Sequence, residues 1–171
     1  MSDYQDKIQS QRGPLKNLLS KVPGFKGYLE KEDRRTADKL LREEVADRYG
    51  KILTKVSAVQ ISLTDQGSLE YLDDLESVVT KVQTFIDRIR NAAYGYSSFF
   101  AAVRVDEETL DKLYEYDQSL LAGANKMEEI LLSLEAADNE PEVQSLIAEL
   151  NRQARELINL ADNRKNVITT E

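Results

Sequence analysis

Residues 69–100 read LEYLDDLESVVTKVQTFIDRIRNAAYGYSSFF, and this stretch decides the fold. Its apolar residues recur at intervals of three and four: Leu69, Leu72, Leu75, Val79, Val82, Ile86, Ile89, Ala93, Tyr96 and Phe100. That spacing places them along one face of an α-helix, with the charged residues on the other faces. The stretch therefore predicts a long amphipathic helix that packs against further helices.

Three other segments carry the same spacing. Apolar stripes run through residues 41–63, 110–134 and 143–161, and Asp106 and Asn139 precede the last two as expected N-caps. No segment alternates apolar and polar residues over the length of a strand, so we expect no sheet. The prediction is an all-α fold, an antiparallel up-down bundle of four long helices with coiled-coil-like packing.

Short loops separate the stripes. Residues 64–68, TDQGS, read as a helix stop followed by Ser68 as the next N-cap. In the sequence NEPE, Asn139 is expected to cap the fourth helix, Glu142 to reach back to it, and Pro141 to occupy the first turn. We expect a single domain, in which residues 1–28 form a short helix and a turn that pack on a bundle of residues 29–171.

The composition removes most catalytic chemistries. The 171 residues include no Cys and no His, which excludes disulfides, thiolate metal sites and any nucleophile that depends on a histidine base. The lack of Cys, of a signal-like N-terminus and of a long apolar run predicts a cytoplasmic protein. We expect no cofactor.

Charge is divided unevenly along the chain. The net charge is -8, but residues 1–55 hold 13 Lys and Arg against 9 Asp and Glu. The acidic remainder repels phosphate backbones and anionic lipid, so we expect no nucleic-acid partner. Membrane contact is open only to residues 1–28, where basic residues alternate with Leu15, Leu18 and Phe25.

An aromatic group is the first candidate for an interaction surface. Aromatic residues gather near the end of the second stripe: Tyr94, Tyr96, Phe99 and Phe100. They either cover the end of the bundle as packed residues or form an aromatic contact surface for a partner.

A basic group is the second candidate. Its members lie close together on the first predicted long helix: Arg34, Arg35, Lys39 and Arg42. They either meet an acidic partner or pair locally with neighbours such as Asp38 and Glu43.

Carboxylates in the first two helices loosely resemble a metal-binding pattern. Some all-α nucleotide pyrophosphohydrolases hold Mg²⁺ on an E-E-x-x-E helix that faces an E-x-x-D helix. The corresponding residues here are Glu43, Glu44, Asp47, Glu70 and Asp73, with Asp47 in the place of a glutamate. In a hairpin that turns near residue 67, Asp47 lies roughly 25 Å from the turn and Glu70 lies beside it. A Mg²⁺-dependent pyrophosphohydrolase is an alternative function, but at this separation the two sets of carboxylates would not face each other. The simpler interpretation is that these carboxylates lie on solvated helix faces.

Asp117 falls on the apolar stripe of the third helix, between Leu113 and Leu120. A buried carboxylate is costly unless it is paired, so we expect a basic residue or a tyrosine hydroxyl opposite it. Arg88, Arg90 and Tyr116 are the nearest candidates.

Several stretches resemble a known group of proteins. They are PGFKGY at 23–28, EKEDRRTADKLLR at 30–42, RIRNAAYGYSSFF at 88–100 and DEETLDKLYEYD at 106–117. Over about half of the chain, these stretches are similar to small bacterial helical proteins of unassigned function. The resemblance implies a helical fold and a bacterial source, and it implies no activity or site residue.

The leading functional hypothesis is a non-enzymatic interaction or scaffold protein that binds a protein partner or a second copy of itself. A peripheral membrane protein attached through residues 1–28 is a further alternative. A homodimer is expected if the first two helices extend past a shorter fourth helix, which would leave Phe99 and Phe100 uncovered. A closed monomeric bundle would instead bury apolar residues on the flanks of the stripes: Val78, Phe85, Leu121, Leu132, Ile147 and Ile158.

Overall fold

The structure, a computed structural model, describes residue 22, residues 34–92 and residues 107–169. These residues form four α-helices: α4 (Arg34–Asp65), α5 (Leu72–Asn91), α8 (Glu107–Ala136) and α9 (Glu140–Thr169). A 3₁₀ turn, η1 (Leu69–Tyr71), precedes α5. The predicted all-α fold is confirmed. Among the described helices, none combines the length and apolar character needed to span a membrane.

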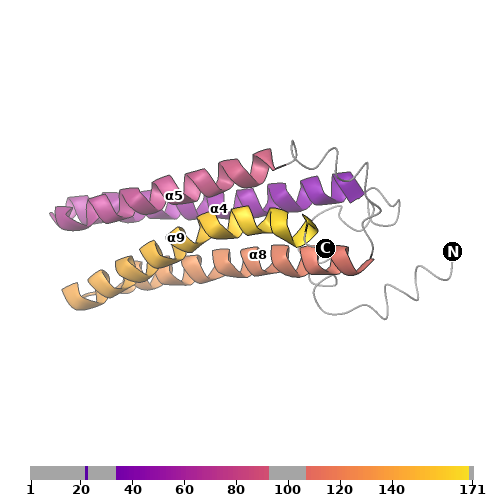
Figure 1. Cartoon of the computed structure of the whole chain (residues 1–171). Coiled ribbons are helices and arrows are strands. Elements are labelled where there is room, and N and C mark those ends of the chain that lie inside the picture. Colours follow the sequence, from indigo (N-terminus) through magenta and orange to yellow (C-terminus); the bar gives the residue numbers. More distant parts are fainter. Residues whose placement is uncertain (1–21, 23–33, 93–106, 170–171) are drawn as a thin grey trace.

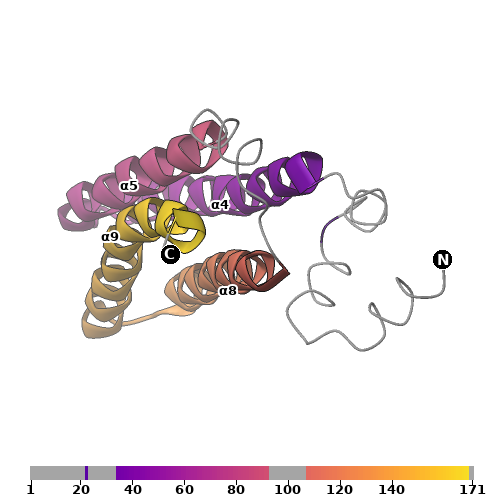
Figure 2. The same ribbon diagram turned by 45° about the vertical axis from the view of Figure 1, so that its right-hand side comes forward.

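The helices form two antiparallel hairpins that lie side by side (Figures 1 and 2). Helices α4 and α5 make one hairpin, and α8 and α9 make the other. The main contacts join α4 with α5, α5 with α9, α9 with α8 and α8 with α4, so the bundle encloses one core. Helices α5 and α8 therefore occupy opposite corners. Figure 1 shows that α4 and α8 run in the same direction, as do α5 and α9.

The first hairpin turns at Gly67, whose φ of 79° lies in the left-handed region that glycine adopts without steric cost. The Ser68 N–H donates to the Leu63 carbonyl at 2.9 Å, and the Gly67 N–H donates to the Thr64 carbonyl at 3.0 Å. These two bonds are a Schellman motif that satisfies carbonyls at the end of α4. The predicted stop is confirmed. Ser68 stands at the N-cap of η1 but makes no side-chain cap bond, so its expected capping bond is wrong.

The second hairpin contains the predicted helix start. Asn139 Oδ1 accepts a hydrogen bond from the Glu142 N–H at 3.0 Å, and the Asn139 amide donates to the Glu142 carboxylate at 2.9 Å. Helix α9 begins at Glu140, with Pro141 in its first turn. The capping bond and the acidic first turn both stabilise the positive end of the helix dipole.

Tyr49 fixes three helices at one height of the core. Its side chain is fully buried, and its hydroxyl donates to the Leu120 carbonyl on α8 at 2.9 Å. Its ring meets Phe85 of α5 edge to face, with ring centroids 4.6 Å apart. Burial raises the pKa of the Tyr49 phenol above its ordinary value. Gly123 leaves room for the hydroxyl, because a Cβ there would lie 2.9 Å from Tyr49 Oη.

The buried face of α5 is wider than the predicted stripe. Val78 and Phe85 are fully buried while Val79 is half-buried, because α5 packs against both α4 and α9. Leu69 is 58% exposed, so its predicted place in the core is wrong; it belongs to η1 and precedes the helix. Helix α5 ends at Asn91, and the expected extension to Phe100 falls in residues 93–106, outside the described residues.

Most of the flank residues fill the bundle. Val78, Phe85, Leu121 and Ile147 are buried, Ile158 is half-buried, and Leu132 is 53% exposed. The fourth helix, α9, has 30 residues, so it is shorter than α4 with 32 but longer than α5 with 20, and the expectation that it is shorter than both is wrong for α5. The expected homodimer depends also on Phe99 and Phe100, which lie outside the described residues. It therefore stays a prediction.

The N-terminal piece, residues 1–28, is represented in the described chain by Val22 alone. Val22 is buried and belongs to the bundle core. The remaining residues of this piece lie outside the described ones, so its predicted short helix stays a prediction.

Surface ion pairs join the contacting helices. One pair bridges each neighbouring couple: Arg90–Asp47 (α5–α4), Arg88–Asp162 (α5–α9), Lys126–Glu149 (α8–α9) and Lys55–Glu128 (α4–α8). Exposed pairs of this kind contribute little stability one by one. Their distribution over all the neighbouring contacts favours this arrangement of helices over others, as flanking charges do in coiled coils.

Replacing Gly123 with Ala is expected to destabilise the protein by about 1–3 kcal/mol, because the new methyl group displaces the buried Tyr49 hydroxyl. In a Tyr49→Phe background, the same replacement is expected to be neutral or stabilising by up to about 1 kcal/mol, since the hydroxyl is gone and Ala is the better helix former. Urea unfolding of the proteins in this cycle gives both values. An equal cost of Gly123→Ala in the two backgrounds would contradict the contact.

Candidate functional site

Charged side chains are buried at the end of the bundle that lies away from the two hairpin turns. They are Asp38 and Arg42 on α4, Asp117 on α8 and Arg164 on α9, and none is more than 6% exposed. Two carboxylates face two guanidinium groups, so the group is balanced in charge. We call these residues the buried ionic network.

Arg164 lies at the centre of this network. Its Nε and Nη2 donate to the two oxygens of Asp117 at 2.7 and 2.8 Å. Nη2 also donates to Oδ1 of Asp38 at 2.8 Å. A guanidinium that meets a carboxylate through two parallel bonds makes one of the stronger and more directional contacts in proteins. Arg164 thereby connects α9 with α8 and, across the diagonal of the bundle, with α4.

Arg42 extends the network to the remaining helix. Its Nε donates to Oδ2 of Asp38 at 2.8 Å. Its Nη1 donates to the main-chain carbonyls of Ile89 and Arg90 at 3.4 and 3.0 Å. These carbonyls belong to the last turn of α5, the negative end of the helix dipole, which favours a cation. The network therefore joins all four helices through hydrogen bonds.

Burial and pairing compete in the network. Burial raises the pKa of the Asp117 carboxyl, while the charge and hydrogen bonds of Arg164 oppose the rise. Burial acts against the charged form of Arg164 as well, but Asp117 and Asp38 outweigh it and hold its pKa well above the ordinary value. Because a guanidinium keeps its proton in proteins, Arg164 requires carboxylates beside it. The arrangement is suited to fixing how the helices pack.

The expectation that Asp117 is paired is confirmed, but the predicted partners are wrong. Its partner is Arg164. Arg88 and Arg90 form surface ion pairs with other residues, and the Tyr116 hydroxyl donates to a main-chain carbonyl of α9.

A signal for the network was present in the sequence. Asp38 stands three residues before Leu41, and Arg164 stands three residues after Ala161, so each continues the apolar stripe of its helix. A charged residue on the stripe of each of three helices indicates that these residues meet in the core.

The basic group does not form one exposed patch. Arg42 is buried in the ionic network and paired with Asp38. Lys39 is exposed and lies 3.7 Å from Glu43. Both contacts are local ion pairs on α4, and local pairing was the predicted alternative to an acidic partner. Nothing is described for the side chains of Arg34 and Arg35, although both residues belong to α4.

The carboxylates of the metal pattern do not converge. Glu43, Glu44 and Asp47 lie in the first half of α4, and each is paired with a basic residue. Glu70 and Asp73 lie beside the hairpin turn, at the other end of the bundle. Over residues 34–92 and 107–169, no three His, Cys, Asp or Glu residues are placed to hold a metal ion.

The aromatic group, Tyr94, Tyr96, Phe99 and Phe100, lies outside the described residues. Their two alternative roles, as packed residues or as a contact surface, stay predictions.

A comparison with family models, curated proteins and solved structures finds no significant match to the chain. Over residues 34–92 and 107–169, the fold and the network define a four-helix all-α protein.

Replacing Arg164 with Met is expected to destabilise the protein by about 3–5 kcal/mol, because Asp117 would be left buried without its cation. Replacing Asp117 with Leu in the same chain removes that uncompensated charge and leaves the Asp38–Arg42 pair in place. The double variant is therefore expected to recover most of the lost stability. Denaturant unfolding measures the unchanged protein, the two single variants and the double variant. A double variant as unstable as the sum of the two single variants would show that the ion pair is not the cause.

Proposed function

We propose that this chain is a non-enzymatic interaction or scaffold protein whose bundle presents helix surfaces to a protein partner. One observation carries the proposal: the buried charged groups are engaged with one another, whereas large apolar side chains stand on the outside. Ile61, Leu69 and Leu132 are 64, 58 and 53% exposed. Exposed apolar residues on a rigid surface are common anchors for protein partners.

The shape of the bundle supports the same proposal. Helix α4 has 32 residues and is therefore about 48 Å long at 1.5 Å per residue. The ionic network joins all four helices and Tyr49 joins three of them at another height, so the surface of this rod is preorganised. A preorganised surface loses less conformational entropy on binding than a mobile one.

The proposed setting is the cytoplasm of a bacterium. The support is the lack of Cys in the sequence and the resemblance of residues 23–28, 30–42, 88–100 and 106–117 to small bacterial helical proteins. The aromatic group and Lys39 remain candidate contact residues beside the exposed apolar ones.

Affinity capture with the whole chain as bait tests this proposal. We expect a captured protein that also binds the bait directly when purified, as measured by isothermal titration calorimetry. Baits with Tyr94→Ala and Phe99→Ala, with Lys39→Glu, or with Ile61→Lys identify the surface, because the residue at the contact is expected to weaken binding by about tenfold or more. Failure of every captured protein to bind the purified bait directly would contradict the proposal.

Self-association is a separate part of the proposal. Phe99 and Phe100 are the residues proposed to pair two copies, because aromatic residues are enriched at such contacts. Light scattering over a range of micromolar concentrations is expected to give a mass above the 19.4 kDa of one chain, and Phe99→Ala with Phe100→Ala is expected to lower it. A constant mass of one chain at all concentrations would show that the protein is a monomer.

A further inference from the structure

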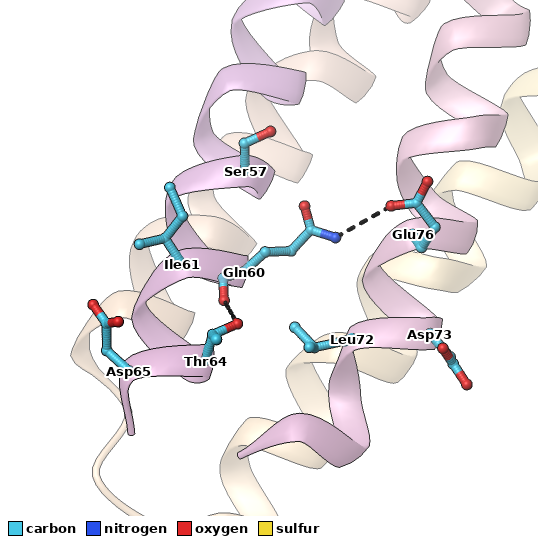
Figure 3. Close-up of a pocket in the computed structure, with 8 residues that line it drawn as sticks. All are labelled: Ser57, Gln60, Ile61, Thr64, Asp65, Leu72, Asp73 and Glu76. Atoms are coloured by element: carbon cyan, nitrogen blue, oxygen red, sulfur yellow. Dashed lines mark hydrogen bonds between the residues drawn. The ribbon is translucent and has the colours of Figure 1, made fainter. Parts of the chain in front are cut away.

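A groove opens on the outer surface between the second half of α4 and the beginning of α5 (Figure 3). Its volume is about 540 Å³, and it is open to solvent. Ile61 on α4 and Leu72 on α5 supply its apolar part, and Ile61 is 64% exposed. Figure 3 shows the side chain of Gln60 reaching across toward Glu76, with a long contact of 3.5 Å between the amide and the carboxylate.

Carboxylates surround this groove. Asp65 of α4 and Asp73 and Glu76 of α5 belong to its lining. Within the described part of the chain, no Lys or Arg forms an ion pair with any of the three. Their charges are therefore available to a ligand that approaches from solvent.

The imbalance extends over the whole end of the bundle at the hairpin turns. Residues 56–80 contain no Lys or Arg but several acidic residues: Asp65, Glu70, Asp73, Asp74 and Glu76. Residues 127–151, in the other hairpin, also lack Lys and Arg and carry seven acidic residues: Glu128, Glu129, Glu135, Asp138, Glu140, Glu142 and Glu149. Two of these are paired with cations from outside this stretch, Glu128 with Lys55 and Glu149 with Lys126 and Arg152.

Acidic residues of both hairpins act on Tyr71, which lies just after the first hairpin turn. After burial, the charges of Glu140 from one hairpin and Glu70 from the other raise the pKa of the Tyr71 phenol. Acidic side chains therefore occur at both hairpin ends, and three of them line the groove itself.

We propose that this groove binds a cationic amphipathic helix of a partner protein. Apolar side chains of that helix would contact Ile61 and Leu72, and its Lys or Arg side chains would meet Asp65, Asp73 and Glu76. The span from Ser57 to Asp65 is about 12 Å, or roughly two helical turns, at 1.5 Å per residue. An amphipathic helix that lies between two helices of a bundle follows a common mode of peptide recognition. This inference rests on the proposed function and names its surface and partner.

The charge of the groove decides which kind of partner fits. Anionic lipid and nucleic acid are repelled by the carboxylates. Lys and Arg are attracted to them, and the attraction speeds association and rejects acidic competitors. The apolar part supplies a contact that salt does not screen, so both features are needed for a specific site.

Fluorescence anisotropy with a labelled peptide tests the groove. The probe is a synthetic helix of about 18 residues, some five turns, that carries Leu on one face and Lys on the others. We expect it to bind the whole protein, and we expect a peptide with Glu in place of every Lys to bind at least about tenfold more weakly. No binding of the Lys peptide, or equal binding of the two peptides, would overturn the proposal.

Matched variants locate the contact. Ile61→Lys is expected to weaken binding of the Lys peptide by at least about tenfold. Leu132→Lys makes a similar change at a residue of comparable exposure on α8, outside the groove, and is expected to change it by less than about twofold. Two double variants form the second matched set, Asp73→Lys with Glu76→Lys in the groove and Glu129→Lys with Glu135→Lys on α8. Both change the net charge equally, and we expect the groove variant to weaken binding of the Lys peptide more. Equal effects within each matched set would show unspecific attraction and would overturn the groove as the site.

The capture experiment separates the two levels of the proposal. In one outcome, a captured partner binds the purified chain equally well after Ile61→Lys, and the groove variants also leave the affinity for the labelled peptide unchanged. The groove is then not the binding site, while the proposed interaction function stands. If Ile61→Lys removes both the partner and the peptide and Leu132→Lys removes neither, the groove is the site.

Discussion

Arg164 is buried among three other helices, where an unpaired guanidinium charge would be too costly to keep. Its two bonds to Asp117 and its bond to Asp38 hold α9 to α8 and α4 at this height of the bundle. Arg42 passes the same constraint to the end of α5. An apolar core of Leu, Val and Ile tolerates rotation and sliding of its helices, whereas these directional bonds do not. We therefore expect the ionic network to favour this four-helix arrangement over others.

The charged side chains at the two ends of the bundle differ in burial and pairing. At one end, carboxylates and guanidinium groups are buried together and balance each other. At the hairpin end, Asp65, Asp73 and Glu76 are exposed, form no ion pair with a Lys or Arg of the described residues, and line a groove with apolar side chains. The charged groups of the first end are desolvated, and their mutual bonds hold the helices together. The carboxylates of the second end face solvent, where a partner can reach them. Structure and proposed function thus occupy opposite ends of one rod.

The four helices of the described residues and the two hairpin turns followed from the sequence, because they depend on local signals such as Gly67 and the Asn139–Glu142 pair. The order of the helices around the core did not, since α5 lies diagonal to α8 and periodicity carries no information about neighbours. The burial of Asp117 was visible on its stripe, but its partner Arg164 is distant in sequence. The groove was missed because Ile61 and Leu72 become neighbours only after the hairpin has formed.

The most direct test of the network is the exchange of the Arg164 Nε proton with water, followed by NMR. The side chain of Arg155, which is exposed on the same helix, provides the reference. If the buried network holds the bundle together, the Arg164 proton exchanges only when the helices separate, and it is expected to be protected by at least about a thousandfold relative to Arg155. Exchange of the two protons at similar rates would contradict the claim that Arg164 is locked between Asp117 and Asp38.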